Sequence, residues 1–187
     1  MQIRIALLFL GCMVIQSCRE EPHLWQPDSR EQVMGEYIET HPEFYSEFGK
    51  LVETTGMCSL LNTRGPYTLF LPDNEAMLDY YEQKNMGSLE EFSDSALKNL
   101  VLYHLVGAEI SANDIGLGAL PETNAIGDYL VTEFQGSDII INKSCRIIDR
   151  DIQAAKGYIH AIDQVIDPVT LDIFSVLEKD PSYSIFA

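Results

Sequence analysis

Residues 157–168 carry the most regular run of apolar positions in the chain, with the sequence GYIHAIDQVIDP. Apolar side chains occupy both alternating sets of positions, and His160, Asp163 and Asp167 are the polar interruptions. A β-branched run of this kind between a glycine and a proline is typical of a strand that is covered on both faces. The pattern therefore predicts a buried strand over residues 157–166.

Apolar residues at helical spacing predict two helices near the start of the chain, over residues 31–40 and 42–55. The first should end before Pro42, because the residue ahead of a proline avoids the helical region. Gly56 is placed to end the second.

Residues 67–72 form a strand-like run that stops at a proline, and a helix should follow it. Asp73 or Asn74 is a suitable N-cap for that helix, and Ser93 is a suitable cap for another over residues 94–102. Further strands are predicted at residues 129–134, 139–141 and 146–148, with a hairpin turn at 135–138.

The first residues predict export followed by lipid attachment. Arg4 precedes an apolar run over residues 5–15 that is too short to span a bilayer as a stable helix, and Cys18 follows directly after Ser17. This stretch resembles the lipobox of bacterial lipoproteins, in which Cys18 would be acylated and become the first residue of the mature chain. The alternative is an ordinary secretory signal, or an N-terminal anchor helix, with an incidental cysteine.

Acidic residues after Cys18, namely Glu20 and Glu21, resemble the surface-export signal of Bacteroidota-type lipoproteins. The resemblance implies a signal peptide over residues 1–17 and a tether over 18–30. The expected location is the outer membrane, with the protein lipid-anchored and exposed at the cell surface; otherwise it is periplasmic.

The formal net charge of −17 excludes nucleic acid as a partner, since no basic patch offsets it. Membrane contact should therefore come through the acyl chains at Cys18. Cys58 and Cys145 are either paired in an oxidising envelope or, as we favour, two buried free thiols. With no CxxC pair and four scattered histidines, the sequence predicts no metal site and no cofactor.

Three ordered segments resemble the fasciclin-like domain family. Residues 65–77 (GPYTLFLPDNEAM) are similar to the family's T-V-F-A-P-T-N-x-A-F box, with Asn74 and Ala76 on its Asn and Ala and Asp73 in place of Thr. Residues 103–106 (YHLV) match its L-x-Y-H-V-V segment, and residues 157–168 match N-G-x-I-H-x-I-D-x-V-L-x-P. The resemblance covers about residues 33–168, and the expected fasciclin-like domain spans residues 31–168.

The family fold implied by this resemblance is α+β: a fasciclin-like wedge, in which a twisted β-sandwich carries helices on one side and edge. Residues 177–187 echo residues 38–49, allowing one deletion. We therefore expect residues 169–187 to be a linker and the first helix of a truncated second domain. The alternative is a C-terminal helix that packs back onto the single domain.

Catalysis is not expected, because the chain has no nucleophile motif, phosphate-binding loop or dinucleotide-binding turn. His104 and His160 lie within apolar runs, where a histidine is most often a core residue with its nitrogens hydrogen-bonded. The protein is therefore not predicted to be an enzyme.

Binding residues come from the resemblance alone. In animal extracellular-matrix members, the Tyr-His segment and an Asp-Ile pair before the closing strand are implicated in receptor binding, which implies Tyr103, His104, Asp151 and Ile152 here. Tyr103 and His104 could equally hold the core.

The expected function is adhesion or ligand capture, with a cell-surface protein or glycan as partner. The first alternative is a glycan-binding accessory lipoprotein beside an outer-membrane nutrient importer, and the second is a structural spacer. An exposed aromatic platform would favour glycan binding, and its candidates are Tyr80, Tyr81, Trp25 and Tyr129.

Overall fold

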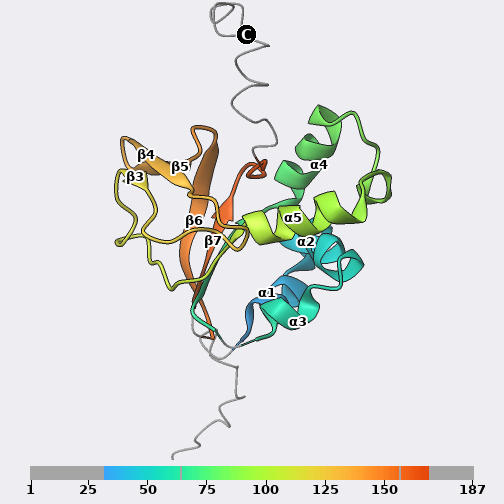
Figure 1. The fold of residues 1–187 in the computed structure, drawn as a ribbon, viewed down its shortest axis with the longest axis horizontal. Helices are drawn as coiled ribbons and strands as arrows, with labels where there is room; N and C mark the ends of the chain where they lie inside the picture. Colours follow the sequence, from blue (N-terminus) through green and yellow to red (C-terminus); the bar gives the residue numbers. More distant parts are fainter. Residues whose placement is uncertain (1–31, 64, 156, 169–187) are drawn as a thin grey trace, which may run out of the picture.

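A computed structural model describes residues 32–63, 65–155 and 157–168, in which a curled mixed sheet packs against a group of helices (Figure 1). The helices are α1 (Met34–Thr40), α2 (Pro42–Thr54), α3 (Cys58–Leu61), α4 (Asn74–Gln83), the 3-10 turn η2 (Leu89–Glu91) and α5 (Asp94–Tyr103). The strands are β1 (Tyr67–Pro72), β2 (Leu105–Val106), β3 (Gly118–Ala119), β4 (Val131–Gln135), β5 (Asp138–Ile141), β6 (Cys145–Ala154) and β7 (Gly157–Ile162). The predicted α+β wedge is confirmed.

The helix starts follow the signals in the sequence. Pro42 is the first residue of α2, where its missing N–H leaves no helical hydrogen bond unmade. Asp73 caps α4 by accepting a hydrogen bond from the Ala76 N–H at 2.8 Å, and Ser93 caps α5 by accepting from Ala96. Of the two predicted caps for α4, Asp73 is the one used.

The seven strands form one sheet in the order β2-β1-β7-β6-β5-β4-β3. β1 and β7 run parallel at its centre, with Tyr67 opposite Gly157 and Pro72 opposite Ile162. The pairs β3–β4, β4–β5, β5–β6 and β6–β7 are antiparallel, and the predicted hairpin is the turn between β4 and β5. The two layers of the expected sandwich are thus the two ends of one curled sheet.

Strands β1 and β7 are covered on both faces, which explains why the run over residues 157–166 lacks a polar face. On one face, Leu69 and Ile159 pack among side chains of the helices. On the other face, Phe70 and Ile162 pack against Ile141 of β5 and its neighbours inside the curl. The β-sheet therefore separates two hydrophobic cores.

Gly157 opens β7 at a point where the sheet leaves no room for a side chain. A Cβ atom on this residue would overlap the backbone carbonyl oxygen of Tyr67 in the neighbouring strand. The glycine of the closing segment is therefore required by close approach of two backbones.

Several predicted boundaries were wrong. The helix expected over residues 31–40 begins at Met34, and the strand expected over residues 129–134 is Val131–Gln135. The strand expected over 146–148 is the start of the ten-residue strand β6, whose charged residues and register shifts between Ile147 and Ile152 conceal it in the sequence. The closing strand ends at Ile162 rather than at residue 166, and the last residues leave the sheet. Helix α3 was not predicted at all.

Cys58 and Cys145 are both free, as favoured from the sequence, and Cys145 is buried as expected, whereas Cys58 is only partly buried because it lies at the start of the short surface helix α3. The predicted signal peptide, the lipid site Cys18 and the tail over residues 169–187 lie outside the described residues. Within the described ranges, no helix is long and apolar enough to cross a membrane.

Candidate functional site

His104 lies at the end of α5 and joins this helix to the segment after β7. Its side chain is 0% exposed. The Ile166 N–H donates to its Nε2 at 2.9 Å, so Nδ1 carries the proton and donates to the Leu100 carbonyl oxygen at 2.8 Å. Burial lowers the pKa of His104 from 6.5 to about 4. The imidazole is therefore neutral at pH 7 and holds the segment after β7 against α5.

Tyr103 is only 2% exposed and belongs to the core inside the curled sheet. Its carbonyl oxygen accepts a hydrogen bond from the Asn124 side chain at 3.4 Å. A partner docking on the folded surface would meet neither Tyr103 nor His104 directly, so a binding role for this pair would act through the shape of the surface above it. Their assignment as binding residues stays a prediction.

Asp151 sits in a bulge of β6 with φ +61°, in the left-handed region that non-glycine residues seldom adopt. Its carboxylate accepts a hydrogen bond from the Ala112 N–H at 2.7 Å, and its own N–H donates to Nδ1 of His160 at 3.2 Å. Ile152 pairs with Ile159 of β7 and packs partly buried against the helical core. Asp151 and Ile152 are thus held rigidly and are both partly exposed.

The His160 side chain holds the β6 bulge in place by a hydrogen bond. It is 0% exposed, and with Nδ1 accepting from Asp151, its Nε2 donates to the Ile110 carbonyl oxygen at 2.9 Å. Burial lowers its pKa, so it also stays neutral, and its ring stacks on Phe70 at 5.6 Å. The prediction that both histidines are core residues with bonded nitrogens is confirmed.

The described contacts do not join the two predicted pairs into one site. His104 connects α5 to the segment after β7, whereas Asp151 connects the β6 bulge to the loop around Ala112. Among the described residues, no group of three or more His, Cys, Asp or Glu side chains could hold a metal ion. Each buried imidazole already uses both nitrogens, so neither is free to take a proton from a ligand.

The aromatic candidates for a glycan platform have different surroundings. Tyr80 is sandwiched between Phe92, which stacks on it at 5.8 Å, and Lys84, whose Nζ lies 5.3 Å from its ring centre. Tyr81 is 4% exposed. Tyr129 is 59% exposed, so within the described part of the chain it is the candidate whose ring a partner can reach. Trp25 lies outside the described residues.

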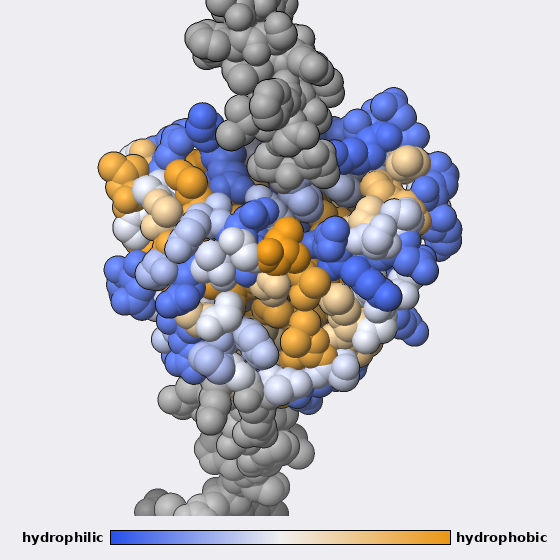
Figure 2. All heavy atoms as spheres, in the orientation of Figure 1, coloured by the Kyte–Doolittle hydropathy of each residue, from blue (hydrophilic) through white to orange (hydrophobic). Residues whose placement is uncertain are grey.

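Apolar surface is concentrated on the β3–β5 end of the sheet. Six of the eight exposed large hydrophobic residues fall between positions 117 and 148. They are Leu117, Ile126, Tyr129, Val131, Phe134 and Ile148, which we call the β-end apolar residues. Figure 2 shows apolar surface on this side of the molecule, and a second area between the sheet and helices α1 and α3. Sequence reasoning missed this surface, because alternation alone did not show which face of each short strand meets solvent.

Sequence reasoning also missed the role of Asn74. Its Oδ1 accepts from the Glu47 N–H at 2.9 Å, and its Nδ2 donates to the Glu43 carbonyl oxygen at 3.1 Å. These groups flank Tyr45, whose φ of −129° and ψ of 16° interrupt helix α2. The position was visible as the Asn of the 65–77 box, but the sequence did not show which groups it would meet.

These features define a class of protein: an α+β domain that carries fixed surfaces, with its two buried histidines, His104 and His160, bonded within the fold. A family model described as "Fasciclin domain" matches residues 43–168, and the chain belongs to the fasciclin domain family. A solved structure titled as a FAS1 domain pair from the insect cell adhesion molecule fasciclin I shares the fold, with a TM-score of 0.59 and 18% identity. That match covers 78% of this chain and 52% of the other.

Relatives come from animals and bacteria. Pig "Transforming growth factor-beta-induced protein ig-h3" is 32% identical over 63% of this chain, and human "Periostin" is 30% identical over 71%. The chain spans only 16% and 15% of these two proteins. "Protein sll1483" of the cyanobacterium Synechocystis is 28% identical, and the match covers 67% of this chain and 68% of the relative.

Proposed function

We propose that the protein is a non-catalytic adhesion or ligand-binding module, anchored to the outer membrane through lipid on Cys18 and exposed at the cell surface. The observation that carries the proposal is the concentration of the β-end apolar residues on one part of the sheet. Large apolar side chains gathered on a surface mark an interaction site more often than single exposed ones do. The solved FAS1 domain pair that shares this fold comes from an insect cell adhesion molecule, which supports this class of function.

The proposed contact surface is built on rigid elements. Val131 lies on β4, which pairs with both β3 and β5, and Tyr129 lies two positions earlier on the same outward face. Phe134, three positions after Val131, lies on the other face of the strand, and Leu117 lies just before β3. Side chains on a paired strand lose little freedom when a partner covers them. Asp151, fixed in its bulge of β6, is a separate candidate contact, where a cation or basic group on a partner could meet its carboxylate.

Paired substitutions test the contact surface. Tyr129→Ser combined with Val131→Ser, which removes two exposed side chains from one face, should reduce binding of the protein to its target cells or matrix at least about tenfold, as expected when apolar anchor contacts are lost. The control is Phe44→Ser combined with Leu78→Ser, which removes equally exposed apolar side chains, each 55% exposed, from the helical side. Equal loss in both variants, or none in the first, would remove this surface from the proposal.

Location and anchoring are tested separately. Protease added to intact cells of the native host should digest the domain while a periplasmic control protein survives. Cys18→Ala should release the protein from the membrane fraction. Protection until lysis would place the domain in the periplasm and end the adhesion proposal, and continued membrane association of the variant would remove the lipid anchor.

Glycan binding is the second candidate, and the 59% exposure of Tyr129 favours it. A sugar ring can stack on an exposed tyrosine, and Tyr129→Ala should then abolish retention on a glycan array, whereas Phe44→Ala should not. Retention that survives Tyr129→Ala would exclude this ring as the platform.

A further inference from the structure

A groove of about 430 Å³ runs between helices α1, α2 and α3 on the helical side of the domain. Ile38, Pro42 and Val52 supply much of its apolar wall, and Cys58 of α3 closes one side. Charged side chains stand at its rim, including Glu39, Lys50 and Glu53. Figure 1 shows the three helices grouped below α5.

Glycines keep this groove open. Gly35 and Gly49 both line it, one from each of the two longer helices. A Cβ atom at Gly49 would come within 3.3 Å of the Ile38 side chain across the groove. A glycine inside a helix is destabilising relative to alanine, so an open groove here is maintained against the preference of α2 itself.

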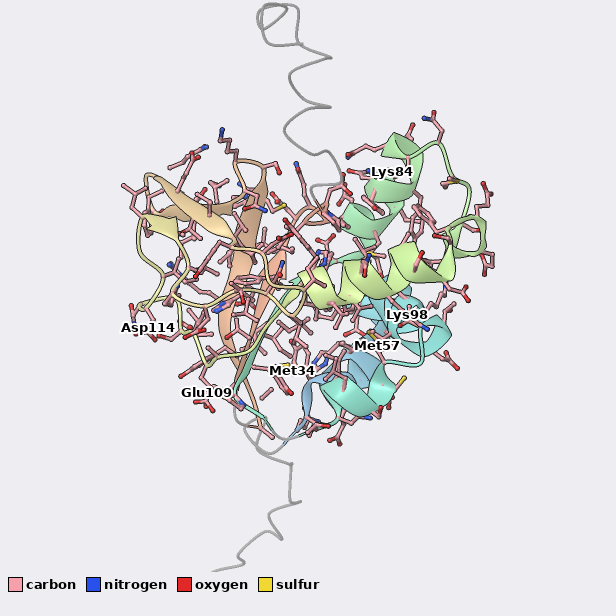
Figure 3. The ribbon with its side chains drawn as sticks, viewed as in Figure 1. Met34, Met57, Lys84, Lys98, Glu109 and Asp114 are labelled. Atoms are coloured by element: carbon pink, nitrogen blue, oxygen red, sulfur yellow. The ribbon has the colours of Figure 1, made fainter. Side chains whose placement is uncertain are left out.

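The described part of the chain begins close to this groove, so the preceding segment joins the fold there. Gln32 is fixed in place because its carbonyl oxygen accepts a hydrogen bond from the Ala155 N–H at 2.7 Å. Gly35 lies three positions later and already lines the groove. Figure 3 labels Met34 at the start of α1 and Met57 just before α3, the two helices that line the groove together with α2.

We propose that the tether docks in this groove through Trp25, the single tryptophan of the chain. Trp25 precedes Gln32 by seven positions, a stretch that reaches about 23 Å when extended. The seven residues of α1 span only about 10 Å, so Trp25 can reach any part of the groove. Pro27 and Asp28 are turn-forming residues, which suit the reversal that docking requires.

The surrounding charges agree with this occupant. Arg30 lies between Trp25 and the fold, where it can approach Glu39 or Glu53 at the rim. Leu24 and Trp25 are the only large apolar pair in residues 19–31, and an aromatic ring of this size suits a mostly apolar groove. With Trp25 docked, only residues 18–24 would separate the lipid from the domain. That consequence rests on the proposed anchor, whereas docking itself does not.

Tryptophan fluorescence tests the docking in the mature chain carrying Cys18→Ala. With excitation selective for tryptophan, emission should be shifted to the blue of a free tryptophan derivative and should resist quenching by acrylamide. Gly49→Met, which fills the groove, should shift emission to the red and raise quenching. Glu82→Met, which adds the same side chain to an exposed position on α4, should change neither.

Cys58 gives a second, independent readout because it lines the groove. Trp25→Ala should speed the reaction of Cys58 with a thiol reagent severalfold, whereas His23→Ala should leave it unchanged. Cys145 is 1% exposed and burial raises its thiol pKa to about 11, so it should react slowly in every variant and report that the fold is intact.

Three results would overturn the proposal: emission like that of free tryptophan in the parent protein, blue emission that Gly49→Met leaves unchanged, or an unaltered Cys58 rate in Trp25→Ala. The second result would place Trp25 on another part of the domain. Because every sample lacks the lipid site, failure of docking leaves the separate fractionation test of the anchor untouched.

Discussion

Asn74 lies at the start of helix α4, but its replacement by alanine should destabilise the domain by weakening helix α2. In a regular helix, the Glu47 N–H would bond to the Glu43 carbonyl oxygen. The backbone at Tyr45 departs from helical geometry, and the Asn74 amide bonds to both groups instead. One side chain at the start of α4 therefore supports the first turn of another helix.

The expected loss follows from the bond lengths. The bonds to Glu47 and Glu43, at 2.9 and 3.1 Å, are of ordinary length and should each contribute about 0.5–1.5 kcal/mol. Those involving Ser46 and Pro42, at 3.3 and 3.4 Å, are long and are counted as nothing. Asn74→Ala leaves the partly buried Glu47 N–H unpaired, whereas the exposed Glu43 carbonyl oxygen can bond to water instead, so we expect a total loss of about 1–2 kcal/mol.

Urea unfolding of the Asn74→Ala protein measures this loss directly as a lower midpoint at unchanged slope. Asn74→Asp keeps the acceptor for Glu47 but loses the donor to Glu43, so it should fall between the parent and the alanine variant. Asn99→Ala, on the exposed face of α5, is the matched control and should stay within about 0.5 kcal/mol of the parent. A loss below about 0.5 kcal/mol in Asn74→Ala would show that α2 regains a regular turn without the amide, and would refute this reasoning.

Two further predictions follow from the closing segment. Burial holds the pKa of His104 at about 4 against 6.5 in the unfolded chain, so the unfolded state takes up this proton first as pH falls. The free energy of unfolding should therefore drop by about 3 kcal/mol between pH 6.5 and pH 4. Urea unfolding at a series of pH values measures this drop, and it should be smaller in His104→Gln. An equally steep drop in the variant would contradict the prediction. Gly157→Ala should lower stability by about 3 kcal/mol or prevent folding, because the added methyl overlaps the Tyr67 carbonyl, and a melting temperature like that of the parent would be the contrary result.

The elements that sequence reasoning located correctly are those with strong local signals. The strand over residues 67–72 was predicted with its observed bounds, because a proline ends it and a capping Asp73 follows. The hairpin at 135–138 and the caps at Asp73 and Ser93 are equally local. Helix α3 is four residues long and begins without a side-chain cap, so no such signal announced it.

The parts that could not be predicted depend on what residues meet across the fold. Nothing near Asn74 in the sequence indicates an irregular turn in α2, about thirty positions earlier. Nothing in the sequence indicates that Gly35 of α1 and Gly49 of α2 line the same groove, because only the packing of the two helices brings them together. The β-end apolar residues looked like ordinary strand positions, since exposure depends on which part of the sheet curls over the other.

Asp151 differs from the other residues implied by the family resemblance in its backbone geometry, and this difference bears on which of the four could contact a partner. A left-handed aspartate is strained, and strain of this kind persists only where neighbouring contacts fix it. Here Ala112 holds the carboxylate and His160 holds the N–H, so the bulge is fixed by two elements distant in sequence. The side chains of Tyr103 and His104 are buried inside the fold, whereas Asp151 presents its carboxylate in a rigid, partly exposed position. Of the residues suggested by family resemblance, Asp151 is therefore the one whose geometry suits direct contact with a partner, and His160 is the residue that positions it.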